Sequence, residues 1–286
     1  MSILVVQLNH PGAEKPFKLG KGYNLYRDKL FREWNNDATH YRKFIQHRGQ
    51  YLSHIGASPM ESELLFWGEW EGNSWFTPLQ IGSPIGIHQP FHSLQVRGHQ
   101  NTDPYVFGNR FHYAVCKQRG RLTQLDPGSV ILFGSSFKKG FALDTVFVVG
   151  SYESVHGVAA HQAKNYSSTY REATLEQLGD TYIHPDKNSN LRLYSGMMYS
   201  EQKDIFSYVP CKPVNDKTIP GFSRMMCPYS HLEFKFSSNP TGFKILAEGE
   251  TQATAIWKKI SAVVTQAGYG MGIFFQEPEA IELKEY

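Results

Sequence analysis

The sequence predicts a mixed α and β fold (α+β), in which a mixed or antiparallel sheet, or a partly open β-barrel, carries flanking helices. Aromatic residues make up 14% of the 286 residues, and their flat side chains suit the half-buried surface of a sheet. Short apolar runs alternate with glycine and proline turns, which is typical of strands. Longer segments with apolar residues three and four apart predict helices.

The chain length fits one large domain or two small ones. We expect a single domain over residues 1–286, with a sub-boundary near residues 151–180 as the alternative. Hydrophobic residues make up 41% of the chain, a fraction near the globular average and sufficient for a full core.

Eight short segments are predicted as strands. The first is a continuous apolar run, which indicates a buried strand. Strands separated by turns such as Asp126-Pro127-Gly128 suggest an antiparallel meander or a small barrel. The eight segments are residues 3–8, 63–70, 111–116, 130–133, 144–149, 192–198, 205–209 and 273–275. Residues 79–96 and 210–220 are expected to be loops because they contain several prolines.

Four segments are predicted as helices from the spacing of their apolar residues. Residues 251–266 form the clearest of them, and Gly268 is their natural C-terminal cap. The others are residues 23–34, 38–46 and 169–178.

Composition restricts the compartment and the partners. A net charge of +3 permits nucleic-acid binding without arguing for it. The short apolar run at the N-terminus lacks the basic region and cleavage site of a signal peptide, and no stretch approaches the roughly 20 apolar residues of a membrane helix. We therefore expect a cytoplasmic protein without a membrane partner.

No metal site is expected from the sequence, and no particular cofactor is indicated. The three cysteines are widely separated, which argues against a disulfide framework and a structural zinc site and favours a reducing compartment. His88 and His92 have the spacing of ligands on a helix, but Pro90 between them breaks such a helix.

The loop after the first predicted strand contains His10 and Glu14. Loops at strand ends often carry function, and an imidazole beside a carboxylate is a usable acid–base pair. Both residues are therefore candidate catalytic groups. The alternative is an ordinary turn bent by Pro11-Gly12.

His40, Arg42 and Lys43 begin the most basic stretch of the chain. On a helix, the guanidinium fork and the ammonium could hold one phosphate. We take all three as candidate ligand-binding residues, and the alternative is a solvated helix face.

Residues 66–71 combine two indoles with two carboxylates. In a strand, Glu69 and Glu71 share one face and Trp70 takes the other. Facing inward, such carboxylates would have raised pKa values, as general acids do, so Glu69 is a candidate catalytic residue and Trp67 a candidate surface for stacking on a base. Facing outward, they would form only an acidic edge strand.

Residues 101–110 form a polar turn. Asp103 is a candidate catalytic residue that can accept a hydrogen bond from a base, and Tyr105 or Phe107 can stack on its ring. Arg110, at the end of the turn, is a further ligand-binding candidate. The alternative is a hairpin entry in which Asp103 caps its own turn.

The order Asp-Pro, aromatic, Phe-Gly and then Tyr-x-x-Cys-Lys, over residues 103–117, resembles the nucleotide modification-associated domain families of bacteria and phages. The resemblance continues through the next two predicted strands to residue 150, with Asp103 where those families have asparagine. It implies a setting of nucleic-acid modification. The strand pattern is also similar to PUA and EVE barrels, which bind bases and modified bases; this is an analogy of fold.

Three functional hypotheses follow. The first is an enzyme that acts on a nucleotide, nucleobase or nucleic acid in a bacterial or phage modification or defence system, with His and carboxylate acid–base chemistry. The second is a non-catalytic reader of a modified base. The third is an interaction subunit of a defence complex. The expected partners are a nucleotide or nucleic acid, with other proteins as a further option.

Overall fold

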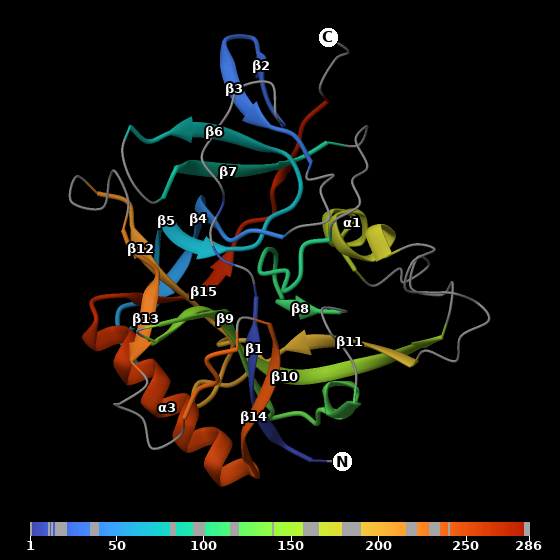
Figure 1. The fold of residues 1–286 in the computed structure, drawn as a ribbon, viewed down its shortest axis with the longest axis vertical. Helices are drawn as coiled ribbons and strands as arrows, with labels where there is room; N and C mark the ends of the chain where they lie inside the picture. The colour runs from blue at the N-terminus through green and yellow to red at the C-terminus, as the bar shows by residue number, and fades with distance from the viewer. Residues whose placement is uncertain are drawn as a thin grey trace.

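The computed structural model describes residues 2–10, 12, 14, 22–34, 40–80, 84–93, 101–114, 120–138, 140–156, 166–178, 190–215, 222–228, 235–239 and 241–282. These residues form two sheets and one long helix (Figure 1). The fold is therefore mixed α and β, as predicted, but strands dominate it.

The first sheet has seven strands in the order β14-β1-β9-β10-β11-β8, with β13 paired to β10. β1 and β9 run parallel and the other pairs antiparallel, so the sheet is mixed. Its strands are β1 (Leu4–Asn9), β8 (His112–Tyr113), β9 (Val130–Phe137), β10 (Gly140–His156), β11 (Asn190–Gly196), β13 (Met225–Pro228) and β14 (Gly242–Glu248).

The second sheet has nine strands in the order β15-β12-β5-β4-β7-β6-β3-β2, with β16 paired to β7. β15 also pairs with β4, which closes β15, β12, β5 and β4 into a small barrel. The strands are β2 (Tyr23–Tyr26), β3 (Lys29–Arg32), β4 (Lys43–Leu52), β5 (Met60–Gly68), β6 (Ser74–Pro78), β7 (Gly86–His92), β12 (Val209–Pro213), β15 (Gly270–Phe275) and β16 (Glu279–Ala280).

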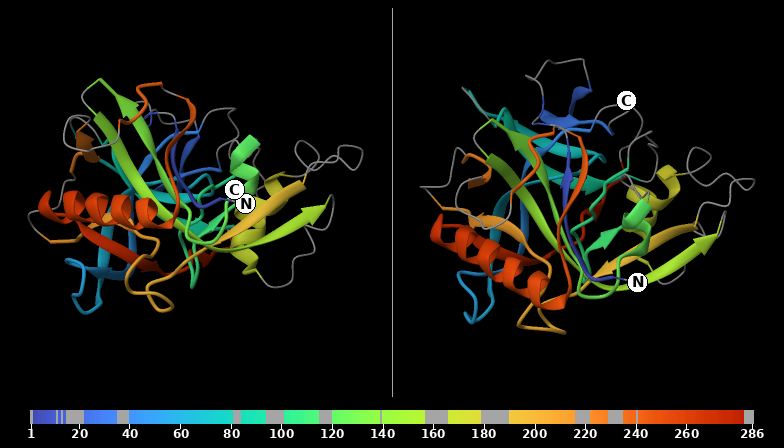
Figure 2. Two further views of the ribbon diagram at one scale, coloured as in Figure 1. Left: turned by 90° about the horizontal axis from the view of Figure 1, so that it is seen from below. Right: turned by 60° about the horizontal axis from the view of Figure 1, so that its bottom comes forward.

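The long helix α3 (Glu250–Gln266) packs on one face of the first sheet. In Figure 2 it lies along one side of the molecule, and the paired strands β10 and β11 reach away on the other. The shorter helical pieces are a 3-10 turn (Gly120–Gln124), α1 (Ser168–Tyr170), a π-helical turn (Arg171–Leu175) and a 3-10 turn (Glu176–Leu178). Among the helices of the described residues, none has the length and apolar character needed to cross a bilayer.

The side chains of β1 alternate between two hydrophobic clusters. Val5 joins the cluster that holds Trp257 of α3, whereas Leu4, Val6 and Leu8 join a cluster that includes residues of both sheets. Because successive strand residues point to opposite faces, both faces of β1 are covered. This explains why four of its six residues are apolar, with Gln7 and Asn9 as the exceptions.

Two predicted helices are wrong. Residues 23–34 form the hairpin of β2 and β3, whose turn residues Arg27 and Asp28 both have positive φ, 47° and 64°. Of the predicted helix 38–46, residues 38 and 39 lie outside the described residues, and residues 43–46 belong to β4, which pairs with β5, β7 and β15. Short aromatic-rich segments fit either periodicity, and strand pairing across the sheet overrides local spacing.

Two expected loops are also wrong in part. Residues 79–96 contain β7, in which Pro90 lies opposite Ser74 of β6. Residues 210–220 contain most of β12, so the strand predicted at 205–209 begins later than expected. A proline removes one backbone donor, and a neighbouring strand can still pair with the residues around it.

The other predicted strands and helices are found in the structure, although β10 (Gly140–His156) is much longer than the strand predicted at 144–149. Strands β6, β13, β14 and β16 were not predicted. α3 matches residues 251–266, and Gly268 has the left-handed φ of 77° expected of a C-terminal cap. Residues 169–178 are helical. Strand β8 is shorter than the predicted strand at 111–116, whose residues 115 and 116 lie outside the described residues.

We expect Gly134→Ala to destabilise the fold. A Cβ at Gly134 in β9 would lie 2.0 Å from the Ala142 carbonyl oxygen of β10, so the paired strands would have to separate, at a cost of at least about 2 kcal/mol. Denaturant unfolding measures this loss. Gly12→Ala is the control, because a Cβ there meets nothing within 4 Å; equal stability of the two variants would contradict the close packing of β9 on β10.

Candidate functional site

Eight ionisable side chains meet where the strand ends of the two sheets come together, and we call them the charge network. His10 follows β1, His40 and Arg42 precede β4, and Glu69 and Glu71 follow β5. The full set is His10, His40, Arg42, Lys43, Glu69, Glu71, Asp144 and Arg224, joined by ion pairs. His40 is 27% exposed, and the other seven side chains are 0–6% exposed.

Glu69 is the centre of the network. Its Oε2 accepts a hydrogen bond from Arg42 Nη1 at 2.8 Å and lies 3.4 Å from His10 Nδ1. Its Oε1 lies 3.2 Å from His40 Nδ1 and accepts a hydrogen bond from the Asp103 backbone N–H at 3.3 Å. His10, Glu69 and Asp103, three predicted catalytic residues, are therefore adjacent.

The carboxylate of Glu69 is held ionised. Burial alone would raise its pKa, but the charges of Arg42 and His10 and the close contact with His40 lower it to about 2. The expectation of a raised pKa was therefore wrong for Glu69, because cations and not indoles surround it. Burial opposes the charged form of His40 as well, yet its close contact with the Glu69 carboxylate raises its pKa overall.

Asp144 connects two arginines. Arg42 Nε lies 3.1 Å from Asp144 Oδ2, and Arg224 Nε donates to Asp144 Oδ1 at 2.9 Å. Arg42 precedes β4 of the second sheet and Asp144 lies in β10 of the first. The charge network therefore ties the two sheets together.

Lys43 and Glu71 form a fully buried pair. Lys43 Nζ donates to Glu71 Oε1 at 2.9 Å, and both side chains are 0% exposed. Arg42 and Lys43 lie at the start of a strand, so the predicted helix that would present them together to a phosphate does not exist. Each is already paired with a carboxylate.

Glu14 belongs to a separate group of residues. It accepts hydrogen bonds from Tyr23 Oη and Arg32 Nε, and its Oε2 lies 2.7 Å from His88 Nε2. His88 Nδ1 lies 2.8 Å from Ser74 Oγ. His88 Nε2 can donate to the Glu14 carboxylate, and the Ser74 hydroxyl, which can donate or accept, satisfies Nδ1 in either protonation state of the ring. Glu14 thus links the β2–β3 hairpin to β6 and β7 and is not joined to His10.

Asp103 lies at the base of a hairpin. Its Oδ1 accepts a hydrogen bond from the Ala114 backbone N–H at 2.9 Å, and the next peptide bond, to Pro104, is cis. Tyr105 and His112 then pair through two backbone hydrogen bonds. The hairpin agrees with the alternative that the sequence left open, but this side-chain bond crosses the hairpin to a residue eleven positions later.

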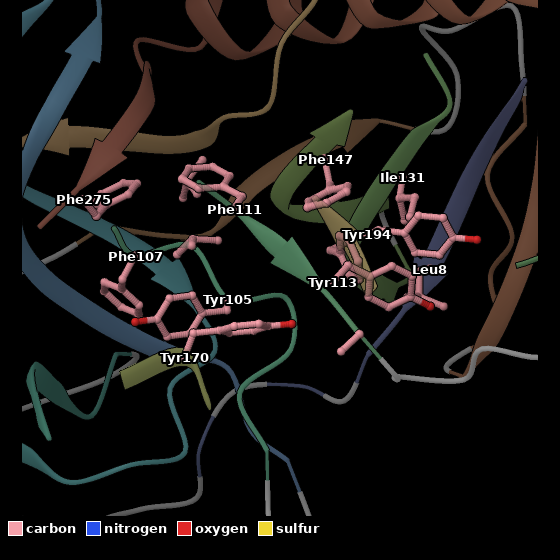
Figure 3. Close-up of a cluster of buried hydrophobic side chains, with 14 of the residues drawn as sticks. Leu8, Tyr105, Phe107, Phe111, Tyr113, Ile131, Phe147, Tyr170, Tyr194 and Phe275 are labelled. Atoms are coloured by element: carbon pink, nitrogen blue, oxygen red, sulfur yellow. The ribbon is translucent and has the colours of Figure 1, made fainter. Parts of the chain in front are cut away.

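A pocket of about 360 Å³ opens next to this hairpin and is called the aromatic pocket. Three predicted ligand-binding residues line it: Tyr105, Phe107 and Arg110. Figure 3 shows Tyr105 and Phe107 side by side, with Tyr170 packed against Tyr105. The full lining is Tyr105, Phe107, Asn109, Arg110, His112, Glu153, Tyr166, Ser167, Ser195 and Glu277.

The polar groups of the aromatic pocket are held in place. His112 stacks on Tyr170 with ring centroids 4.4 Å apart, and burial, with the charge of Arg110, lowers the pKa of His112 to about 3. Its neutral ring offers one donor and one acceptor. Arg110 Nη1 donates to the Gly196 carbonyl at 3.0 Å and pairs with Glu201.

One layer of side chains separates the pocket from the charge network. Trp70, between Glu69 and Glu71 in the chain, packs edge-on against Phe107 with centroids 5.3 Å apart. Gly108 has a positive φ of 79°, and a Cβ there would lie 2.7 Å from the Glu277 side chain.

Trp67 lies on the other side of the charge network. Its Nε1 donates to the Phe222 carbonyl at 3.0 Å, and the Arg224 guanidinium lies 5.9 Å from its ring. The cavity beside Trp67 and Arg42 is about 10 Å³, roughly the space of one water. Trp67 therefore does not share a base-sized pocket with Tyr105 and Phe107.

A larger, open cavity of about 1080 Å³ adjoins the aromatic pocket at Asn109. Its walls come from the β4–β5 turn, from β15 and from residues 198–204, including Tyr199. No sequence motif marked it.

Several residues of these regions were missed by the sequence reasoning. Asp144 interrupts an apolar strand, and a lone carboxylate in such a run is a usable signal of a buried pair. Arg224, His112 and Tyr166 carry no comparable signal, because their importance comes only from what packs beside them.

We expect Glu14 to make the free energy of unfolding depend on pH in the acidic range. Burial would raise its pKa, but the charge and hydrogen bond of His88, with the charges of Lys43 and Arg32, lower it from 4.5 to about 2. A lowered folded-state pKa stabilises the fold above pH 4.5, and this is lost as the pH falls towards 2. The effect is on the order of 3 kcal/mol.

Urea unfolding of the wild type and Glu14→Gln between pH 7 and pH 3 tests this expectation. The wild type should be more stable at pH 7, and the difference should shrink below pH 4.5. Glu61→Gln is the control, because Glu61 is 63% exposed. A stability difference that is constant with pH would contradict the buried role of Glu14.

Comparisons with protein-family models, with curated proteins and with solved structures returned no significant match. The chemistry of the charge network and the aromatic pocket is therefore the basis for assigning a function.

Proposed function

We propose that the protein binds a base-containing ligand in the aromatic pocket and acts on it as an enzyme of nucleic-acid modification. The observation that carries the proposal is the pocket itself, whose walls combine the rings of Tyr105, Phe107, His112 and Tyr166 with polar edges. Rings that face a ligand stack on any nucleobase, and fixed polar groups select its edge.

The size of the pocket suits this class of ligand. Its volume of about 360 Å³ lies at the small end of the range for small-molecule sites, which is roughly 300–1,000 Å³. His112 Nδ1 lies 3.4 Å from Ser195 Oγ, so its Nε2 is the atom that can donate to or accept from a base, and Glu277 and Glu153 can accept from amino groups. Arg110 supplies the positive charge for a phosphate or an oxygen-rich edge.

The charge network is where we place the chemistry, and Trp70 and Phe107 must then move to let the reacting part of the ligand reach it. His10 and Glu69 lie 3.4 Å apart, and an imidazole held beside an ionised carboxylate is a usable acid–base pair. The resemblance of residues 101–150 to nucleotide modification-associated domains supports the same setting, because the Tyr105 to His112 hairpin falls inside it.

A non-catalytic reader of a modified base is the second candidate. It is favoured by the burial of the network, in which seven of the eight side chains are at most 6% exposed. A reader needs only the aromatic pocket. The two candidates therefore share the binding site and differ in whether the bound ligand changes.

We expect Tyr166→Ala to weaken ligand binding by about tenfold, because loss of one stacking ring costs about 1–3 kcal/mol. Calorimetry with a panel of nucleobases, nucleoside monophosphates and short single-stranded oligonucleotides, including modified bases, measures the effect. Tyr199→Ala is the matched control, since Tyr199 lines the larger cavity instead. Mass spectrometry of the recovered ligand then separates enzyme from reader.

Two outcomes would contradict the proposal. One is the absence of binding by every member of the panel. The other is binding that Tyr199→Ala weakens and Tyr166→Ala does not, which would place the base outside the aromatic pocket.

A further inference from the structure

We propose that His40, Glu69 and Glu71 bind a divalent metal ion of the first transition row. One ligand atom from each residue lies within 4.8 Å of the other two. The three residues come from two segments, one before β4 and one after β5, which the pairing of these strands brings together. This inference is independent of the ligand proposed for the aromatic pocket.

The position of His40 relative to Glu69 supports the binding of one metal ion by both residues. Its Nδ1 is shielded from solvent and lies 3.2 Å from Glu69 Oε1, yet the two atoms are not aligned for a hydrogen bond. Two ligands each about 2.0–2.1 Å from one tetrahedral ion are roughly 3.3–3.4 Å apart. The spacing is therefore that of two atoms directed at a common ion.

The surrounding contacts orient the carboxylates. Arg42 and His10 lie at Glu69 Oε2, and Lys43 holds Glu71 Oε1. Hydrogen bonds to ligating carboxylates are a regular feature of metal sites, because they fix the direction of the ligand oxygens. Glu69 is thereby held with its Oε1 towards His40.

The charge balance of the network indicates which further ligand a bound metal ion would need. Glu69, Glu71 and Asp144 contribute three negative charges, and Arg42, Lys43 and Arg224 contribute three positive ones. The carboxylates and the Arg and Lys side chains therefore balance, and an ion bound by a neutral His40 leaves a surplus of two positive charges. An anionic group, hydroxide or a phosphate oxygen, would complete the site, and His40, at 27% exposure, is its solvent-facing side.

The ligand set favours particular ions. One imidazole with two carboxylates suits zinc, manganese or iron, whereas calcium is bound by six to eight oxygens. The sequence-based expectation of no metal rested on the isolated cysteines and on His88 with His92, and this site uses none of them.

Calorimetry on the chelator-treated full chain with zinc and then manganese chloride tests the proposal. We expect one ion per chain, with zinc tighter than manganese. His40→Ala should weaken zinc binding at least about 100-fold, beyond the 10–100-fold typical of a residue that only orients a ligand. Glu71→Asp, which retains the charge that Lys43 needs but shortens the reach, should also weaken it.

His54→Ala is the matched control, because His54 is an exposed histidine and its loss should leave zinc affinity unchanged. Cobalt substitution gives a second measurement, since its visible absorption should change between wild type and His40→Ala. The proposal is overturned if the wild type binds neither ion at millimolar concentration, or if His40→Ala binds zinc as tightly as the wild type.

Discussion

The buried ion pairs of Arg42 are the interaction on which the rest of the structure depends. One guanidinium contacts Glu69, which follows β5, and Asp144, which lies in β10, so a single side chain joins the two sheets. A buried charge left without its partner costs about 3–5 kcal/mol. The strand ends around Arg42 are therefore held in one arrangement, and the candidate site is built on that arrangement.

The same network is where the proposed chemistry is placed. Hydrophobic clusters on both faces of β1 stabilise the sheets without requiring any charge. Replacing a buried ion network by apolar residues is often neutral or stabilising, so stability alone gives no reason for eight ionisable groups at this place. In the proposed function, the base-binding pocket and the reacting groups are neighbours, with Trp70 packed against Phe107 between them.

Part of the candidate site could be found without coordinates. His10 and Asp103 were selected as polar residues of a loop and a turn, and Glu69 as a carboxylate near indoles in a predicted strand; all three are adjacent in the structure. Glu14 was selected from the same loop as His10, but it joins His88 and Arg32 instead. Distance along the chain says little about which of several loops meet, because the order of strands in a sheet decides it.

The sequence by itself determined the elements whose pattern is long or continuous. Two examples are the mainly apolar strand β1 and the seventeen-residue helix α3, which Gly268 follows. In each segment, only one type of secondary structure buries the apolar side chains. Tertiary structure alone decided the short aromatic segments, as in the β2–β3 hairpin, and the meeting of His40, Glu69 and Glu71. The physical reason is that strand pairing and ion pairing are made between segments far apart in the chain, so no local pattern encodes them.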